Sequence, residues 1–214
     1  MINLNINQIL TQNSKLKKTS KLNNKRVFNF GIIANKSLEG KSTCPFAKGC
    51  LGKDYKCYAQ KGAYAWPKVK EAYNNRYLLT KQDNFINLMN EAIQKKKVDI
   101  LRLHDSGDFY SINYLNKWIQ IANDNKEVIF YAYTKSIPFF KRTKENNNNW
   151  LLPNNLVIIF SEGSKKDNLI NTTKDRHSRI FKDINSLLSA GYINASDNDL
   201  NAITDNKKVG LLLH

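Results

Sequence analysis

The alternation of short apolar runs with amphipathic segments constrains the fold of this chain more than any other feature. Several of the runs are apolar at consecutive positions, which is typical of strands buried on both faces. The segments 68–96 and 114–122 carry apolar residues at helical spacing, and Gln82 and Asp83 mark a division of the longer one. This order predicts an α/β fold with a mostly parallel sheet. The predicted strands are 27–34, 98–104, 128–134, 156–161 and 209–214.

The length of the chain narrows the architecture further. With 214 residues the chain suits a single domain, and it is short for the strand–helix units of a complete barrel. We therefore expect a partial barrel of the (β/α)6 type. Residues 1–26 are polar, basic and low in complexity, so they are expected to form a flexible N-terminal arm before a single α/β domain at 27–214.

The net charge of +16 comes from 34 Lys and Arg residues against 18 Asp and Glu residues. Lys outnumbers Arg by 28 to 6, although Arg is favoured for bidentate recognition of phosphates and bases. Much of the charge is therefore interpreted as a compositional bias toward Lys. The stretch before Glu39 is different, because it has no acidic residue and its charges are close together, so a nucleic-acid partner is an alternative there. Most of its basic residues lie before Val27: Lys15, Lys17, Lys18, Lys21, Lys25 and Arg26.

The sequence shows no sign of a membrane partner. No stretch approaches the ~20 apolar residues that a membrane-spanning helix needs. The N-terminus, MINLNINQIL, lacks the charged region and the long apolar region of a signal peptide. We therefore expect a cytoplasmic protein.

Polar side chains follow three of the predicted strands, at 104–108, 134–136 and 161–163. Because the carboxyl ends of parallel strands meet at one edge, where α/β proteins build their sites, we expect these clusters to lie together. Ser106 and Asp108 have an alternative role as helix N-caps. The predicted catalytic groups, for acid–base chemistry and anion binding, are His104, Asp108, Lys135 and Glu162. Predicted cofactor contacts at the same edge are Asp105, Ser106, Gly107, Thr134 and Ser161.

Cys44, Cys50 and Cys57 are the cysteines of the chain, and they lie in one loop. Their odd number argues against a disulfide framework. Thiolates are soft ligands for zinc and for iron–sulfur clusters, and the lysines of this loop are expected to lower the thiol pKa values. Three ligands leave one coordination position open, as a catalytic metal requires. Two sites are consistent with this pattern: a [4Fe-4S] cluster, or zinc completed by His104 or His177.

Three segments together resemble the phage gene product 88 family. They are STCPFAKGC with the following KCYA, LRLHDSGDFYSINYLNKWIQIA, and VIFYAYTKS. The similarity extends over most of residues 27–214 and includes the C-terminal KVGLLLH. The resemblance implies a protein of bacteriophages and mobile elements, and hence a location in the host cytoplasm.

The cysteine loop is more distantly similar to that of radical S-adenosylmethionine proteins. Those proteins carry three cysteines after the first strand of a partial barrel, an aromatic residue beside the last cysteine, and a Gly-Gly-Glu-like motif after the second strand. Here Tyr58 follows Cys57, and Ser106-Gly107-Asp108 follows the second predicted strand. The spacing C-x5-C-x6-C is longer than the C-x3-C-x2-C of that superfamily. The resemblance implies a [4Fe-4S] cluster and S-adenosylmethionine as cofactors, with Tyr58 among the cofactor contacts.

These observations lead to two hypotheses on function. The first is an iron–sulfur enzyme of the radical S-adenosylmethionine type, acting on a substrate that the residues do not identify. The alternative is a metal-stabilised protein that binds nucleic acid or inhibits a host system without catalysis.

Overall fold

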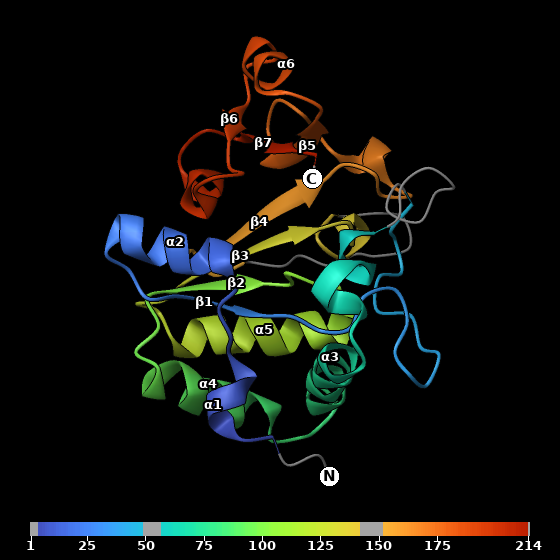
Figure 1. Ribbon diagram of the computed structural model, residues 1–214, viewed down its shortest axis with the longest axis vertical. Helices are drawn as coiled ribbons and strands as arrows, with labels where there is room; N and C mark the ends of the chain where they lie inside the picture. The colour runs from blue at the N-terminus through green and yellow to red at the C-terminus, as the bar shows by residue number, and fades with distance from the viewer. Residues whose placement is uncertain (1–3, 49–56, 142–151, 214) are drawn as a thin grey trace.

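A computed structural model describes residues 4–48, 57–141 and 152–213, whose strands form one parallel sheet (Figure 1). The seven described strands follow the order β1-β2-β3-β4-β5-β7-β6, and the sheet curls into a half-barrel. The predicted α/β class and partial barrel are confirmed. The strand order differs from that of a (β/α)6 barrel, because β7 lies between β5 and β6. The strands are β1 (Val27–Phe30), β2 (Ile100–Leu103), β3 (Ile129–Thr134), β4 (Leu156–Ser161), β5 (His177–Phe181), β6 (Ile193–Asn194) and β7 (Lys208–Leu212).

The helices follow the predicted amphipathic segments and add several that the sequence pattern did not indicate. The long segment 68–96 divides as predicted around Gln82 and Asp83. The α-helices are α1 (Ile6–Ile9), α2 (Ser14–Asn23), α3 (Pro67–Leu79), α4 (Phe85–Lys95), α5 (Ile112–Asp124) and α6 (Ile184–Ser189). Short 3-10 helices are η2 (Tyr58–Gln60), η3 (Gly62–Ala65), η4 (Ile137–Phe139), η5 (Asp167–Leu169) and η6 (Asp199–Ile203). Within the described residues, no helix is long and apolar enough to cross a membrane.

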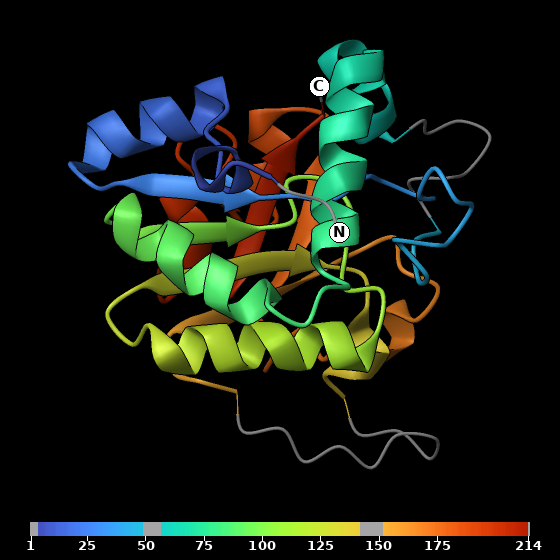
Figure 2. The same cartoon turned by 90° about the horizontal axis from the view of Figure 1, so that it is seen from below.

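The two faces of the sheet are covered by different elements. Helices α1, α4 and α5 lie on one side of β1–β3, which we call the outer face, and α2 lies on the other, the inner face (Figures 1 and 2). Side chains alternate along each strand, so paired residues such as Val27 and Ile100 point to the inner face, while Phe30 and Leu103 point to the outer face. The outer core is aromatic, with the Trp118 ring centroid 5.3 Å from that of Phe30.

A buried carboxylate ties the inner face together. Asp199, on η6, is fully buried, and its Oδ1 lies 2.7 Å from the Lys15 Nζ of α2. Its Oδ2 lies 3.0 Å from the Arg102 Nη1 of β2 and also accepts a hydrogen bond from the Tyr131 hydroxyl of β3. Burial alone would raise the pKa of Asp199, but Arg102 and Lys15 outweigh it and lower the pKa. The buried charge of Asp199 thus connects η6 with α2, β2 and β3.

The N-terminal segment differs from the flexible arm expected for residues 1–26. Ile9 and Leu10 are buried in the outer core, and Leu16 is buried on the inner face. Asn13 caps α2, because its side chain accepts a hydrogen bond from the Leu16 backbone N–H at 2.9 Å. The few apolar residues among many polar ones are therefore spaced to bury one side of a helix, and residues 4–26 pack as part of the domain.

The burial of Leu16 yields a test of this packing. We expect Leu16→Ala to lower the free energy of unfolding by roughly 2–5 kcal/mol, because it removes a fully buried side chain from the inner face. Leu22→Ala, on the same helix but 61% exposed, is the matched control and should change it by less than about 0.5 kcal/mol. Urea denaturation measures the stability of both variants. Small losses of equal size would contradict the packing of α2 and support a flexible N-terminal arm.

Candidate functional site

The carboxyl ends of β1–β4 meet at one edge of the sheet, and Asp108 connects the segments that follow β1, β2 and β3. Its Oδ1 accepts hydrogen bonds from the Phe109 N–H at 2.7 Å and the Thr134 Oγ1 at 2.6 Å. Its Oδ2 accepts from the Lys135 N–H at 2.8 Å, and its own N–H donates to the Thr43 carbonyl at 3.0 Å. Burial raises the pKa of Asp108, although the bonds from Thr134 and Lys135 oppose this. Asp108 therefore joins the cysteine-bearing segment to β2 and β3.

Lys135 extends this cluster to β4. Its Nζ donates hydrogen bonds to the Ser161 Oγ at 2.7 Å and to the Glu162 carbonyl at 2.8 Å. The Glu162 carboxylate takes a different partner, since its Oε2 accepts from the Arg179 Nε at 2.7 Å. The structure thus brings Thr134, Lys135 and Ser161 together as expected, but it pairs Glu162 with β5.

His104 lies in a different environment from the other predicted catalytic groups. It adopts a left-handed backbone conformation with φ of 62° and is buried. Its Nε2 lies 3.0 Å from the Tyr114 hydroxyl, and its ring packs edge-on against Phe109 at 4.5 Å between centroids. Burial lowers the pKa of His104 to about 3, so the ring is neutral near pH 7. These contacts place His104 against the outer core, and its Nδ1 has no hydrogen-bond partner among the described residues.

Asp105 is the centre of a tyrosine cluster that the sequence pattern did not indicate. Its Oδ2 accepts hydrogen bonds from the Tyr73 hydroxyl at 2.8 Å and the Tyr64 hydroxyl at 3.2 Å. The Tyr58 hydroxyl donates to the backbone carbonyl of Asp105. The other carboxylate oxygen, Oδ1, is buried and has no hydrogen-bond partner among the described residues. A Cβ at Gly31 would lie 1.9 Å from this oxygen, so glycine is required there.

A cavity of about 410 Å³ opens beside these tyrosines. Its wall joins the segment after β1, the turn after Cys57 and helix α3. The predicted cofactor contact Ser106 lines it, and Gly107 packs directly behind, against Ile32. Its polar lining residues are Asn35, Lys36, Gln60, Tyr64, Lys70, Tyr73 and Ser106.

Neither Ser106 nor Asp108 caps the helix that follows them. The side chain of Ser111 accepts the hydrogen bond from the Tyr114 N–H at 3.2 Å and so forms the N-cap of α5. The capping alternative for the two earlier residues is therefore wrong. The hydrogen-bonding groups of Ser106 and Asp108 serve the carboxyl edge instead, where the Ser106 carbonyl accepts from the Ile32 N–H at 3.0 Å.

Cys44 and Cys57 both lie at this edge, and Cys50 falls outside the described residues. The Asn35 N–H donates to the Cys44 Sγ at 3.4 Å. Burial, followed by the charges of Asp108 and Cys57, raises the pKa of Cys44 to about 12. Within the described residues, burial therefore outweighs the expected lowering of the Cys44 pKa by lysines, and Lys53 and Lys56 of that expectation lie outside the described residues.

The described residues do not support the predicted metal-binding loop. In the ranges 4–48, 57–141 and 152–213, no group of three or more His, Cys, Asp or Glu side chains is placed to hold a metal ion. Both ring nitrogens of His177 are in hydrogen bonds, with the Tyr192 hydroxyl at 2.9 Å and the Asp175 carbonyl at 3.0 Å. Both nitrogens of His177 are thus occupied, whereas His104 uses only Nε2 and its buried Nδ1 has no hydrogen-bond partner among the described residues.

A family model described as gene product 88 matches residues 7–214. The chain belongs to the gene product 88 family. The match begins before α2, so this basic helix belongs to the region that the gene product 88 model covers. No curated protein and no solved structure matches this chain. The expected resemblance to gene product 88 is confirmed, and the likeness to radical S-adenosylmethionine proteins stays a prediction.

The buried histidine yields a pH test. Folded His104 stays neutral down to about pH 3, whereas in the unfolded chain it binds a proton below about pH 6.5. The contribution of the neutral ring to the free energy of unfolding is therefore fully present above pH 6.5. It is lost as the pH falls toward 3, by about 1.4 kcal/mol per pH unit. We expect His104→Asn, which tolerates the left-handed backbone, to be less sensitive to acid. Between about pH 7 and 4.5, the free energy of unfolding measured by urea denaturation should fall more in the wild type than in the variant, by roughly 2–3 kcal/mol. Equal losses would contradict the neutral ring.

The Gly107 turn yields a second test. A Cβ there would meet the Ile32 Cγ1 at 2.3 Å and the Ile32 carbonyl oxygen at 2.9 Å, and the φ of +79° disfavours other residues. We expect Gly107→Ala to lower the free energy of unfolding by roughly 2–5 kcal/mol. Gly191→Ala is the matched control, since its φ is +74° but no atom lies within 4 Å of the added carbon. It should cost about 1–2 kcal/mol from backbone strain alone, and equal losses would exclude the clash with Ile32.

Proposed function

We propose that this gene product 88 protein is an iron–sulfur protein of the radical S-adenosylmethionine type, with a [4Fe-4S] cluster held by Cys44, Cys50 and Cys57. The observation that carries the proposal is the position of Cys44 and Cys57. Both lie at the carboxyl edge of a parallel half-barrel, and a negative charge on Cys57 contributes to the raised pKa of Cys44. That edge is where α/β proteins place their chemistry.

The surroundings of Cys44 suit a thiolate ligand. The Asn35 N–H points at its sulfur, and hydrogen bonds of this kind tune metal–thiolate sites. Burial keeps the thiol protonated at neutral pH in the metal-free protein, so cluster binding would release a proton from Cys44. When bound, a [4Fe-4S] cluster supplies one-electron chemistry and an open coordination position at its fourth iron.

The cavity supports a small-molecule ligand, and it is lined by Asn35, whose N–H donates to the Cys44 Sγ. Its volume of about 410 Å³ is in the range of binding pockets for small molecules. Gln60 and Ser106 offer polar groups in its wall, while Tyr64 and Tyr73 offer aromatic surfaces. Behind the two tyrosines, the buried carboxylate of Asp105 orients both hydroxyl groups. A ligand that carries both an apolar ring and polar groups, as S-adenosylmethionine does, would match this lining.

The remaining edge residues would position groups around the reacting centre. Lys135 holds a positive charge against the Ser161 hydroxyl and is available to an anionic group. Asp108 holds the loops of β2 and β3 together and so keeps Lys135 in place. We assign Glu162 to orientation of Arg179 at the rim of the site.

The zinc alternative is less well supported by the same geometry. A Cys3His site needs a histidine with a ring nitrogen available near the cysteines. His177 uses both nitrogens in hydrogen bonds, whereas His104 uses Nε2 with Tyr114 and its Nδ1 has no partner among the described residues. The geometry therefore disfavours a zinc site completed by His177, and the metal content of a His104 variant separates the cluster from a zinc site completed by His104.

Metal content tests the proposal directly. We expect protein purified without oxygen, or reconstituted with iron and sulfide, to hold about four iron and four sulfide per chain. Cys44→Ser, Cys50→Ser and Cys57→Ser should each reduce the iron content strongly. His104→Asn is the control, because it should retain the iron but would lose the metal of a zinc site completed by His104. Folded protein that stays metal-free, or that holds a single zinc, would refute the cluster.

A further inference from the structure

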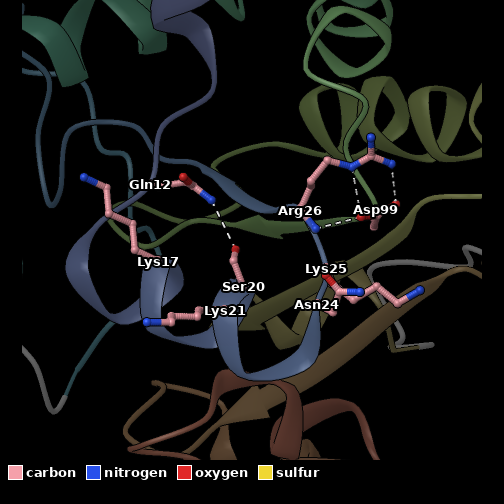
Figure 3. A pocket seen from close by; sticks show the side chains of 8 residues that line it. All are labelled: Gln12, Lys17, Ser20, Lys21, Asn24, Lys25, Arg26 and Asp99. Atoms are coloured by element: carbon pink, nitrogen blue, oxygen red, sulfur yellow. Dashed lines mark hydrogen bonds and ion pairs between the residues drawn. The ribbon is translucent and has the colours of Figure 1, made fainter.

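A second hollow, of about 600 Å³, lies at the amino edge of the sheet, where Arg26 precedes β1 and Asp99 precedes β2 (Figure 3). Its wall comes from α2, the turn that follows it, and the residue before β2. Four cationic side chains and one carboxylate line it: Lys17, Lys21, Lys25, Arg26 and Asp99. We call this hollow the basic pocket.

The packing of α2 explains why its lysines face this pocket. Leu16 and Thr19 are buried on the inner face, and Lys15 is drawn toward Asp199. Lys17 and Lys21 are exposed on the remaining surface, one helical turn apart. Like charges at this spacing repel each other and destabilise an isolated helix slightly, so a bound polyanion would relieve a repulsion that is already present.

The turn after α2 brings further charge to the same place. Asn24 adopts a left-handed conformation, with φ of 49°, and its N–H donates to the Ser20 carbonyl. This geometry ends the helix and directs the chain into β1. Lys25 and Arg26 occupy the turn between Asn24 and β1, so they lie at the rim of the pocket.

The carboxylate in the pocket is already neutralised. The Asp99 Oδ2 accepts from the Arg26 backbone N–H at 2.7 Å and Nε at 3.1 Å, and its Oδ1 accepts from Nη2 at 2.9 Å. These hydrogen bonds from Arg26 lower the pKa of Asp99 to about 2. Lys17, Lys21 and Lys25 have no ion-pair partner within the described residues, and Figure 3 shows the Lys17 and Lys21 amines directed away from the Arg26–Asp99 pair.

We infer that the basic pocket binds the phosphate backbone of double-stranded nucleic acid without reading its sequence. Lysine ammonium groups are point charges that contact phosphates without selecting a base. No aromatic side chain lines the pocket, so it lacks the stacking surfaces on which single strands are held. This inference does not rest on the proposed iron–sulfur function, because the pocket lies at the opposite edge of the sheet.

Binding of a labelled duplex tests the inference. We expect the full-length protein to bind a fluorescein-labelled duplex of about 20 base pairs, measured by anisotropy between about 50 and 200 mM salt. Lys17→Ala, Lys21→Ala and Lys25→Ala combined should weaken binding about tenfold or more at the lower salt and reduce the salt slope by roughly two to three. Alanine favours the helix at Lys17 and Lys21, so the variant should remain folded, as circular dichroism would check.

A matched variant separates this site from the overall charge. Lys68→Ala, Lys166→Ala and Lys182→Ala combined remove the same number of charges from exposed positions outside the pocket. This control should bind within about threefold of the wild type. Equal losses in the two variants, or a wild type that does not bind the duplex, would overturn the inference.

Two further comparisons define the ligand. Duplex DNA and duplex RNA share the backbone chemistry that the pocket would recognise. Measuring the affinity for each by anisotropy identifies which of the two duplexes binds more tightly. Tighter binding of a single strand of the same length would overturn the assignment to duplexes. The cysteine variants should bind the duplex as the wild type does, so loss of the cluster would leave this result unchanged.

Discussion

The carboxylate of Asp199 is the interaction on which the inner face of this half-barrel depends. A curled parallel sheet must cover both faces, and here the inner face is closed by α2 from one end of the chain and η6 from the other. A single buried carboxylate holds both against β2 and β3 through Lys15, Arg102 and Tyr131. Removing one partner would leave an uncompensated charge in the interior, which is why such networks are costly to break. The position of the basic helix follows from this network.

A second buried carboxylate, Asp108, plays the corresponding role at the carboxyl edge. It accepts hydrogen bonds from β3 residues while its N–H holds the segment that carries Cys44. Asp199 thus organises the inner face of the sheet, and Asp108 organises its carboxyl edge. The proposed chemical site and the proposed nucleic-acid site are each built around segments that these two residues hold in place.

Separation of the two sites across the sheet has a functional consequence. A duplex held at the amino edge would not enter the cavity beside the cysteines, so the basic pocket would tether the protein to nucleic acid. The reaction, if the cluster is present, would occur on a ligand small enough for a cavity of about 410 Å³. Nucleic-acid binding and cluster chemistry, which the sequence presented in separate hypotheses, would therefore be compatible in the folded protein.

The sequence by itself determined the parallel α/β class, the division of 68–96 into two helices, and the meeting of three polar clusters at one edge. Those features follow from local periodicity and from the geometry of parallel strands. Only the tertiary structure decided which polar residues meet. It placed His104 in an aromatic core, gave Asp105 its tyrosine partners, and paired Lys15 with Asp199. Such pairings depend on sheet register and curvature, because they join residues far apart in the chain, and local pattern carries no information on them.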